Sequence, residues 1–225
     1  MNRGKRETRL DLKSEAGRNV LRALAAEADV LIESFRPGVM ERLGIGYETL
    51  RALNPRLVYC AITGYGATGS FVDHPGHDLN YIGYAGVLDQ LASRDGVPIL
   101  PNFQIADLLG GALSAVTQIL AALWHVSRGG SGRFVDVSMT HVTYAHNVVA
   151  QVALANEVFS PSEAAVGEAR DHGEIVGDED EAEAGLVHQP AQVGRRDVVD
   201  VQRQDLEGQV GIGQAAPARQ RRRVD

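Results

Sequence analysis

The chain has 225 residues, of which 44% are hydrophobic and 23% charged, and its formal net charge at pH 7 is −7. This length can bury a hydrophobic core, and the acidic balance argues against a nucleic-acid-binding protein. The single cysteine, Cys60, excludes an internal disulfide and favours a reducing compartment. Since no apolar stretch approaches the roughly 20 residues of a membrane span, and the N-terminus lacks a secretory signal, we expect a cytoplasmic protein that does not bind membranes.

Residues 8–150 alternate between short β-like runs and amphipathic helical runs. The expected strands cover residues 8–12, 29–34, 56–63 and 133–139, and the expected helices cover residues 14–28, 39–44, 47–54, 78–91, 107–126 and 140–157. Alternating strands and helices predict an α/β fold with an incomplete, Rossmann-like parallel sheet and helices on its faces.

The composition changes after about Phe159. The last part of the chain, from Pro161 on, has no aromatic residue and only two leucines. Such a segment buries too little apolar area to offset its ordering entropy. We therefore expect two parts, an α/β domain over residues 1–156 and a polar, disordered tail over residues 157–225.

A glycine-rich sequence, "GYGATG" at Gly64 to Gly69, matches the dinucleotide-binding fingerprint after an expected strand. That fingerprint requires a helix to begin at its end, so that helix amides face a pyrophosphate. Here "SFVDHPG" follows, with Pro75 and no helical period. We therefore do not expect nicotinamide binding.

The neighbouring "DHPGHD" carries two histidines and two aspartates around a Pro-Gly turn. No further His/Cys cluster completes a ligand set, so we expect no metal site. Taken alone, Asp78 is a helix N-terminal carboxylate that interacts with free amides, and His77 lies just outside that helix.

A long apolar helix is expected to begin at Asp107, and N-capping alone would explain that aspartate. The pair Gly110 and Gly111 in its first turn is less easily explained, because each costs about 1 kcal/mol relative to alanine. We expect that something packs closely there, and a substrate beside Asp107 would fit.

Several stretches together resemble the family III CoA-transferases, in the family's order and spacing over residues 2 to about 155. They are "NRGKRETRLDLKSEAGR", "ADVLIESFRPGVMERLGIGYETLRALNPRLVYCAITGYGATG", "PGHDLNY" and "IADLLGGALSAVTQILAALW" followed by "GSGRFVDVSM". Two of these motifs are similar to those of the 2-methylacyl-CoA racemase branch of the family. They are "GHD" followed by "NY" at residues 76–81, and "AD" at residues 106–107, at the start of the helix with two glycines.

The resemblance implies that His77 and Asp107 form an acid/base pair that flanks the α-carbon of an acyl-CoA thioester. It implies that the thioester and pantetheine are lined by Gly76, Asp78, Leu79, Asn80 and Tyr81. The residues implied near the nucleotide of CoA are Leu10, Asp11, Leu12, Lys13, Ser34, Phe35, Arg36, Arg42, Thr63, Gly64, Tyr65 and Gly66. The cations among them, Lys13, Arg36 and Arg42, suit phosphate groups chemically.

The family chemistry implies an acyl-CoA thioester as substrate, with coenzyme A as part of it, and no metal, flavin or nicotinamide. An α-proton is removed on one face of the carbon and returned on the other. Family members are interlocked homodimers with a further strand-helix-strand segment before "NRGKR" and a smaller domain after the helix at "THVTYAHNVVAQ". We therefore expect a chain truncated at both ends relative to the family, with residues 1–156 as a partial CoA-binding domain.

Two alternatives stay open at this point. In CoA transfer, Asp107 attacks the thioester to form a mixed anhydride, and His77 is incidental. In the other alternative the chain is an inactive fragment.

Overall fold

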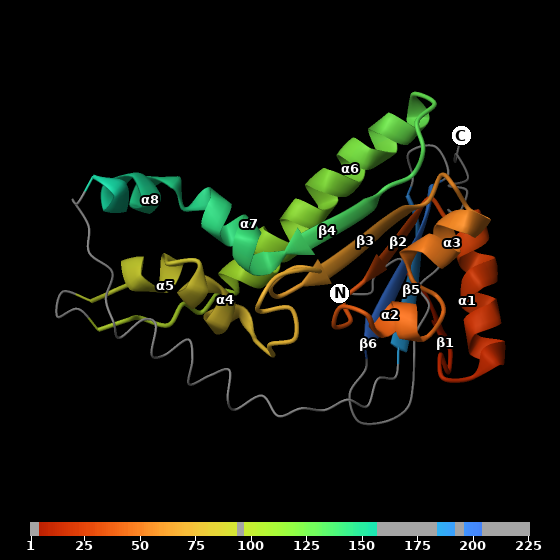
Figure 1. The fold of residues 1–225 in the computed structure, drawn as a ribbon, viewed down its shortest axis with the longest axis horizontal. Coiled ribbons are helices and arrows are strands. Elements are labelled where there is room, and N and C mark those ends of the chain that lie inside the picture. The colour runs from red at the N-terminus through yellow and green to blue at the C-terminus, as the bar shows by residue number, and fades with distance from the viewer. Residues whose placement is uncertain (1–4, 94–96, 157–183, 192–195, 204–225) are drawn as a thin grey trace, which may run out of the picture.

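The computed structural model describes residues 5–93, 97–156, 184–191 and 196–203 and confirms the expected α/β class (Figure 1). Its sheet has six strands in the order β1-β5-β6-β2-β3-β4. Their bounds are β1 Arg6–Arg9, β2 Val30–Glu33, β3 Val58–Thr63, β4 Phe134–Ser138, β5 Ala184–Ala191 and β6 Arg196–Arg203. The β6-β2-β3-β4 part is parallel, whereas β5 pairs antiparallel with both β1 and β6.

The helices follow the expected order with two interruptions. Their bounds are α1 Glu15–Glu27, α2 Val39–Arg42, α3 Tyr47–Leu53, α4 Asp78–Tyr84, α5 Val87–Gln90, the π-helix η1 Ala106–Leu113, α6 Ser114–Ser127, α7 Met139–His146 and α8 Val148–Ala155. The helix expected over 78–91 divides at Gly86, whose φ of +74° favours glycine, and the helix expected over 140–157 divides at Asn147. Helices α4, α5, α7 and α8 extend away from the sheet (Figure 1).

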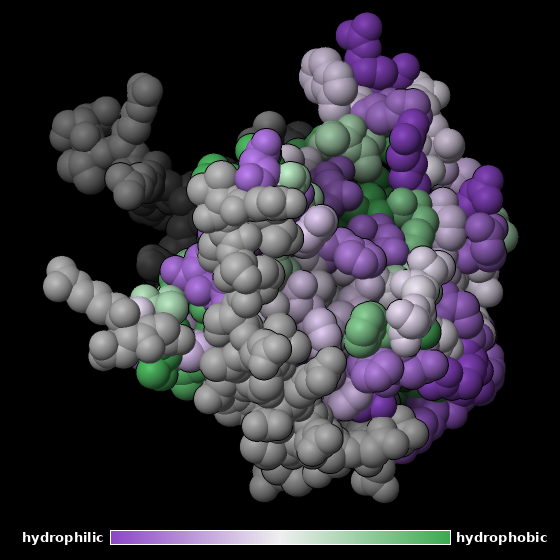
Figure 2. Space-filling model, turned by 60° about the vertical axis from the view of Figure 1, so that its left-hand side comes forward, coloured by the Kyte–Doolittle hydropathy of each residue, from purple (hydrophilic) through white to green (hydrophobic). Residues whose placement is uncertain are grey.

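The sheet is covered on both faces, and the alternation of side chains along β3 shows how. Tyr59 and Ala61 belong to a core cluster with α1, α2 and α3. Val58 and Cys60 belong to a second cluster with α6. Both faces are therefore apolar, which explains the nearly continuous apolar run of this strand. Cys60 is buried and forms no disulfide. Figure 2 shows an outer face on which hydrophilic side chains predominate and hydrophobic residues form smaller patches.

Two strands lie in the part of the chain for which the sequence predicted no regular structure. In β6, Val199 and Val201 are fully buried and pack in the same cluster as Leu31 and Tyr59. The local pattern "DVVDV" has the period of a strand, and its signal was lost in the polar average of the tail. The rest of the predicted tail, residues 157–183, 192–195 and 204–225, lies outside the described residues.

Among the residues that the structure describes, one helix, Ala106–Ser127 (η1 and α6 together), is long and apolar enough to cross a membrane. The expectation that no apolar stretch approaches this length is therefore not met. One side of the helix packs on the sheet through Ala115, Ile119 and Ala122, and the other exposes Leu120 and Trp124. Because core helices can have the same length and composition, this single helix is weak evidence for a span.

Helix α1 begins where the sequence predicts, with Ser14 as its N-cap. The Ser14 Oγ accepts a hydrogen bond from the Gly17 N–H at 3.0 Å and donates one to the Asp11 carbonyl at 2.8 Å. The hydroxyl thereby satisfies a first-turn amide of the helix and closes the turn before it.

Replacing Ser14 with alanine is expected to lower the free energy of unfolding by about 1 kcal/mol, because the N-cap acceptor is lost. Urea unfolding followed by circular dichroism measures this. Ser127→Ala, which removes an exposed hydroxyl bonded to the Trp124 carbonyl at the end of α6, is the matched control. Equal stability of the two variants would contradict the capping role.

Candidate active site

A cavity of about 430 Å³ opens beside the C-terminal ends of β2 and β3, where open parallel sheets commonly bind ligands. Its walls come from the segments after these two strands, from the loop before α4, and from α4, η1 and α7. The lining residues are Ser34, Phe35, Arg36, Pro37, Ile62, Thr63, Gly64, Tyr65, Val72, His74, Pro75, Gly76, His77, Tyr81, Asp107 and Met139.

The structure brings the two predicted acid/base residues and part of the predicted binding set into this cavity. The predicted residues that do not line it are Leu10, Asp11, Leu12, Lys13, Arg42, Gly66, Asp78, Leu79 and Asn80. Sequence reasoning missed Pro37, Ile62, Val72, His74, Pro75 and Met139. Val72 and His74 lie in "SFVDHPG", and the other four lie in the stretches that resemble the family. Their motifs were therefore visible in the sequence, but that their side chains meet at one cavity follows only from the fold.

His77 is held at the start of α4 by its backbone. It is the N-cap residue, and its N–H donates to the Asn80 Oδ1 at 2.8 Å. Asn80 is 1% exposed, so its side chain serves this cap and does not line the cavity. The exposed His77 side chain is thus presented from a fixed backbone at the cavity wall.

Tyr81 packs against the loop that precedes α4. A side chain at Gly76 would collide with the Tyr81 ring, at 2.7 Å from its Cε1, and one at Gly64 would collide with it as well. The Tyr81 hydroxyl donates to the Gly76 carbonyl, and burial raises the pKa of Tyr81 well above its usual range. Gly64 therefore leaves room for an aromatic ring of the protein itself.

Asp107 lies in the first turn of η1 and is partly buried. Burial raises the pKa of its carboxyl, the nearby Asp78 carboxylate raises it further, and His77 opposes both effects. A raised pKa brings the protonated form closer to neutral pH, as a carboxyl that must both donate and accept a proton requires. The effect of His77 also shows that the two predicted acid/base residues interact electrostatically.

Asp78 lies in the first turn of α4, as the sequence predicts, but the amide that it binds belongs to another helix. Its Oδ1 accepts a hydrogen bond from the Asp107 N–H at 2.9 Å, which links the start of α4 to the start of η1.

The two glycines of η1 have a different explanation from the one expected. A Cβ at Gly110 would lie 2.5 Å from Thr143 Oγ1 and 2.7 Å from the Met139 carbonyl oxygen, both in α7. A Cβ at Gly111 would lie 3.1 Å from the Met139 Cγ. The close packing expected at these glycines is therefore made by α7. The π-helical geometry of η1 is itself rare and is often found at functional sites.

The residues predicted near the nucleotide divide into two groups. Arg36 lines the cavity and lies close enough to Tyr81 to oppose the effect of burial on the pKa of that phenol. Leu12, by contrast, is 3% exposed and belongs to the core, so it is not open to a ligand. Arg42 is exposed on α2, outside the cavity.

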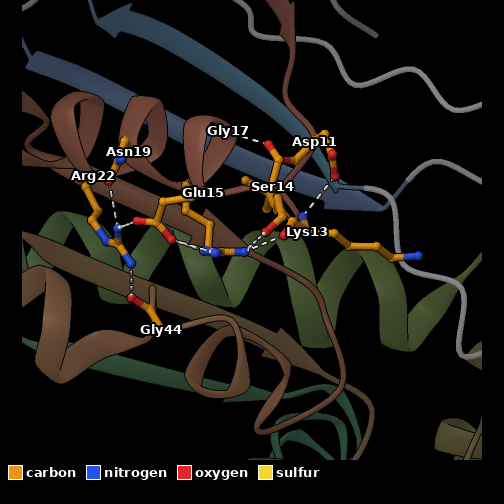
Figure 3. Close-up of polar contacts among 10 residues, drawn as sticks. Asp11, Lys13, Ser14, Glu15, Gly17, Asn19, Arg22 and Gly44 are labelled. Atoms are coloured by element: carbon orange, nitrogen blue, oxygen red, sulfur yellow. Dashed lines mark hydrogen bonds and ion pairs between the residues drawn. The ribbon is translucent and has the colours of Figure 1, made fainter.

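The Lys13 segment forms a well-ordered turn before α1 (Figure 3). The Lys13 N–H donates to the Asp11 Oδ1 at 2.9 Å, and the Arg18 guanidinium donates to the Lys13 carbonyl at 2.6 Å. Arg18 and Arg22 also pair with Glu15 at 2.6 and 2.8 Å. Figure 3 shows the Lys13 side chain extending away from this network.

Among the residues that the structure describes, no group of three or more His, Cys, Asp and Glu side chains could hold a metal ion. The cluster around His74 and His77 is thus not arranged as a ligand set.

Comparison with known proteins decides the family. The sequence profile of CoA-transferase family III matches residues 1–199. The chain belongs to CoA-transferase family III. The match extends past residue 156, the boundary predicted from composition.

Members of CoA-transferase family III that resemble the chain carry two kinds of name. The chain is 43% identical over 143 residues to the human alpha-methylacyl-CoA racemase, and the match covers 64% of this chain and 37% of the relative. It is 40% identical over 144 residues to the succinate–glutarate CoA-transferase of Agrobacterium fabrum, covering 64% of this chain and 36% of the relative. The chain thus spans little more than a third of the length of these two curated relatives.

A solved structure is similar in fold to this chain. The CAIB/BAIF family protein of Brucella suis superposes with a TM-score of 0.63 at 32% identity, covering 79% of this chain and 45% of that one. The family is thereby established, and the names of the relatives leave open which reaction applies here.

Proposed function

We propose that this chain carries the acid/base pair of an acyl-CoA isomerase, which inverts the α-carbon of a 2-methylacyl-CoA thioester. One observation supports this most strongly. His77 and Asp107, 30 residues apart in the sequence, both line one cavity and interact electrostatically. Inversion requires such a pair, because one group removes the α-proton and another returns a proton to the opposite face.

The two residues exchange roles with the direction of the reaction. With one epimer, the neutral imidazole of His77 accepts the α-proton and the protonated Asp107 donates to the other face. With the other epimer, the Asp107 carboxylate accepts and the His77 imidazolium donates. The resulting enolate carries negative charge, which the positive N-terminal end of the η1 helix dipole would stabilise.

Substrate binding is proposed to use the cation in the cavity. Arg36 would pair with a phosphate of coenzyme A, as its planar guanidinium suits phosphate oxygens. The proposed reaction moves only protons, so it requires no metal, flavin or nicotinamide. The homodimer expected from the resemblance and the cytoplasmic location expected from the sequence stay predictions.

Replacing either acid/base residue is expected to reduce inversion of a 2-methylacyl-CoA by about 10²–10⁴-fold, the usual contribution of one general acid or base. Chiral chromatography of the CoA ester measures inversion in wild type, His77→Ala and Asp107→Asn. His146→Ala, which removes an exposed imidazole on α7, is the matched control and is expected to leave the rate unchanged. Folded wild-type chain that inverts neither epimer would contradict the proposal.

CoA transfer is the second candidate, favoured by the transferase names among the relatives. In that reaction the Asp107 carboxylate would attack the thioester carbonyl, forming an acyl-aspartyl anhydride and releasing the CoA thiolate. Hydroxylamine would trap the anhydride, and CoA would pass to an added carboxylic acid. Transfer that survives His77→Ala but not Asp107→Asn, without inversion, would favour this candidate over the isomerase.

A further inference from the structure

One side chain joins the two segments that carry the proposed acid and base. Asp78 is the first residue of α4, directly after His77, and its Oδ1 accepts the Asp107 N–H of η1 at 2.9 Å. These partners are 29 residues apart in the sequence, so the bond is a tertiary contact and not a local turn. It also satisfies one of the amides that the first turn of a helix leaves without an intrahelical partner.

An ordinary capping role within α4 does not account for Asp78. The N-terminal end of α4 is closed by Asn80, whose Oδ1 accepts the His77 N–H at 2.8 Å. The Asp78 carboxylate is bonded to the other helix, and it is only partly exposed. Two side chains of the "HDLN" segment therefore bind different backbone groups. Asn80 accepts the N–H of His77, and Asp78 accepts the N–H of Asp107.

We propose that Asp78 is a positioning residue, which fixes the start of η1, and with it Asp107, relative to His77. The proposal rests on the acid/base function proposed above for those two residues. Catalysis by two bases depends on their separation, and a misplacement of about 1 Å can cost 10²-fold in rate. The two helices also pack against each other.

The negative charge of Asp78 also affects the pKa of Asp107. Burial contributes most to the raised pKa of Asp107, and the Asp78 carboxylate adds to it because two like charges lie close together. The other groups that face Asp107 are His77, which opposes the increase, and Tyr81 of α4, with Arg36 beside Tyr81. Met139 of α7, which also lines the cavity, is uncharged. Removing the Asp78 charge alone should therefore lower the pKa of Asp107.

Two variants separate the hydrogen bond from the charge. Asp78→Asn retains an acceptor oxygen and loses the charge, and Asp78→Ala loses both. Asp73→Asn is the matched control, because it removes the same charge from an exposed position in the loop before α4. Carbon-13 NMR of the Asp107 carboxyl gives its titration, amide hydrogen exchange reports the Asp107 N–H, and the rate of inversion against pH reports on catalysis.

Asp107 is expected to titrate at lower pH in Asp78→Asn than in wild type, and the limb of the inversion profile that depends on its ionisation should shift with it. In Asp78→Ala the Asp107 amide should lose protection, and kcat for inversion should fall about 100-fold with little change in KM. Asp73→Asn should match wild type in every readout.

An unchanged Asp107 titration in Asp78→Asn, together with unchanged amide protection in Asp78→Ala, would overturn the proposal. If wild type inverts neither epimer, the proposed function fails, yet these two measurements still decide whether Asp78 holds Asp107. If inversion is present and Asp78→Ala retains full kcat, the positioning role is wrong and the isomerase function stands.

Discussion

Replacing Gly110 with alanine is expected to destabilise the fold by about 2–3 kcal/mol, whereas Gly111→Ala should remain within about 1 kcal/mol of wild type. The Cβ at position 110 would meet the Thr143 hydroxyl at 2.5 Å and the Met139 carbonyl oxygen at 2.7 Å. Backbone atoms of α7 cannot move independently, so the helices must separate. The nearest neighbours of a Cβ at position 111 would be side-chain atoms, the Cγ and Sδ of Met139 and the Cγ2 of Ile62, the nearest at 3.1 Å. That small cost is offset by the better helix propensity of alanine.

Chemical denaturation of the two variants, which differ by one position on the same helix, tests this directly. Separation of η1 from α7 would also displace Asp107 and Met139 in the cavity, so Gly110→Ala should lose more inversion activity than Gly111→Ala. Equal stability of Gly110→Ala and wild type would contradict the close packing. It would favour the substrate contact that the sequence alone suggested for these glycines.

The stability of wild type is expected to fall as the pH rises from about 4.5 to about 8, because of one buried carboxyl, Glu33. Glu33 is 7% exposed at the end of β2, and its Oε2 accepts the Phe35 N–H at 2.7 Å. Burial raises the pKa of this carboxyl from 4.5 to about 8, and the Phe35 N–H only partly offsets the increase. Glu41 and Asp136 add further negative charge near it.

The direction of this change in stability with pH follows from the number of protons that the folded and unfolded states bind. Between these two pH values the folded state keeps the Glu33 proton and the unfolded state has lost it. The stabilising effect of the proton is therefore complete below the unfolded pKa and is lost as the pH rises through the folded pKa. The change is on the order of 2–4 kcal/mol.

Glu33→Gln isolates this contribution, since glutamine is neutral at every pH and keeps an oxygen for the Phe35 N–H. Thermal unfolding at a series of pH values should show a flatter stability profile in Glu33→Gln than in wild type, and greater stability above pH 8. Glu48→Gln, at an exposed position of α3, should retain the wild-type profile. A wild-type profile that is already flat between pH 5 and pH 8 would show that Glu33 is ionised in the fold.

Much of the fold could be predicted because local patterns determine it. The alternation of strands and helices over residues 8–150 follows from hydrophobic period, and Ser14 marks the start of α1. Strand β6 was missed because its few buried valines lie in a polar segment, and only pairing with β2 shows that they are core residues. The break at Gly86 has a local signal, a glycine within a helical run, that was given too little weight.

The candidate site could be predicted only in part, since several of its contacts are tertiary. His77 and Asp107 were found through the motif resemblance, and the structure places both at one cavity. The bond from Asp78 to the Asp107 amide joins residues far apart in the chain, and no spacing rule indicates it. Gly110 was noticed through its cost in a helix, but its partner, Thr143 of α7, follows only from how the two helices cross.

The most direct test of the account follows the α-proton of each 2-methylacyl-CoA epimer separately in deuterium oxide. Wild type should incorporate deuterium and invert both epimers. In His77→Ala, Asp107 should still exchange the α-proton of one epimer without inverting it, and in Asp107→Asn, His77 should do the same with the other. Inversion of both epimers by His77→Ala, or hydroxylamine-trapped anhydride with no α-exchange in wild type, would contradict the two-base pair of His77 and Asp107.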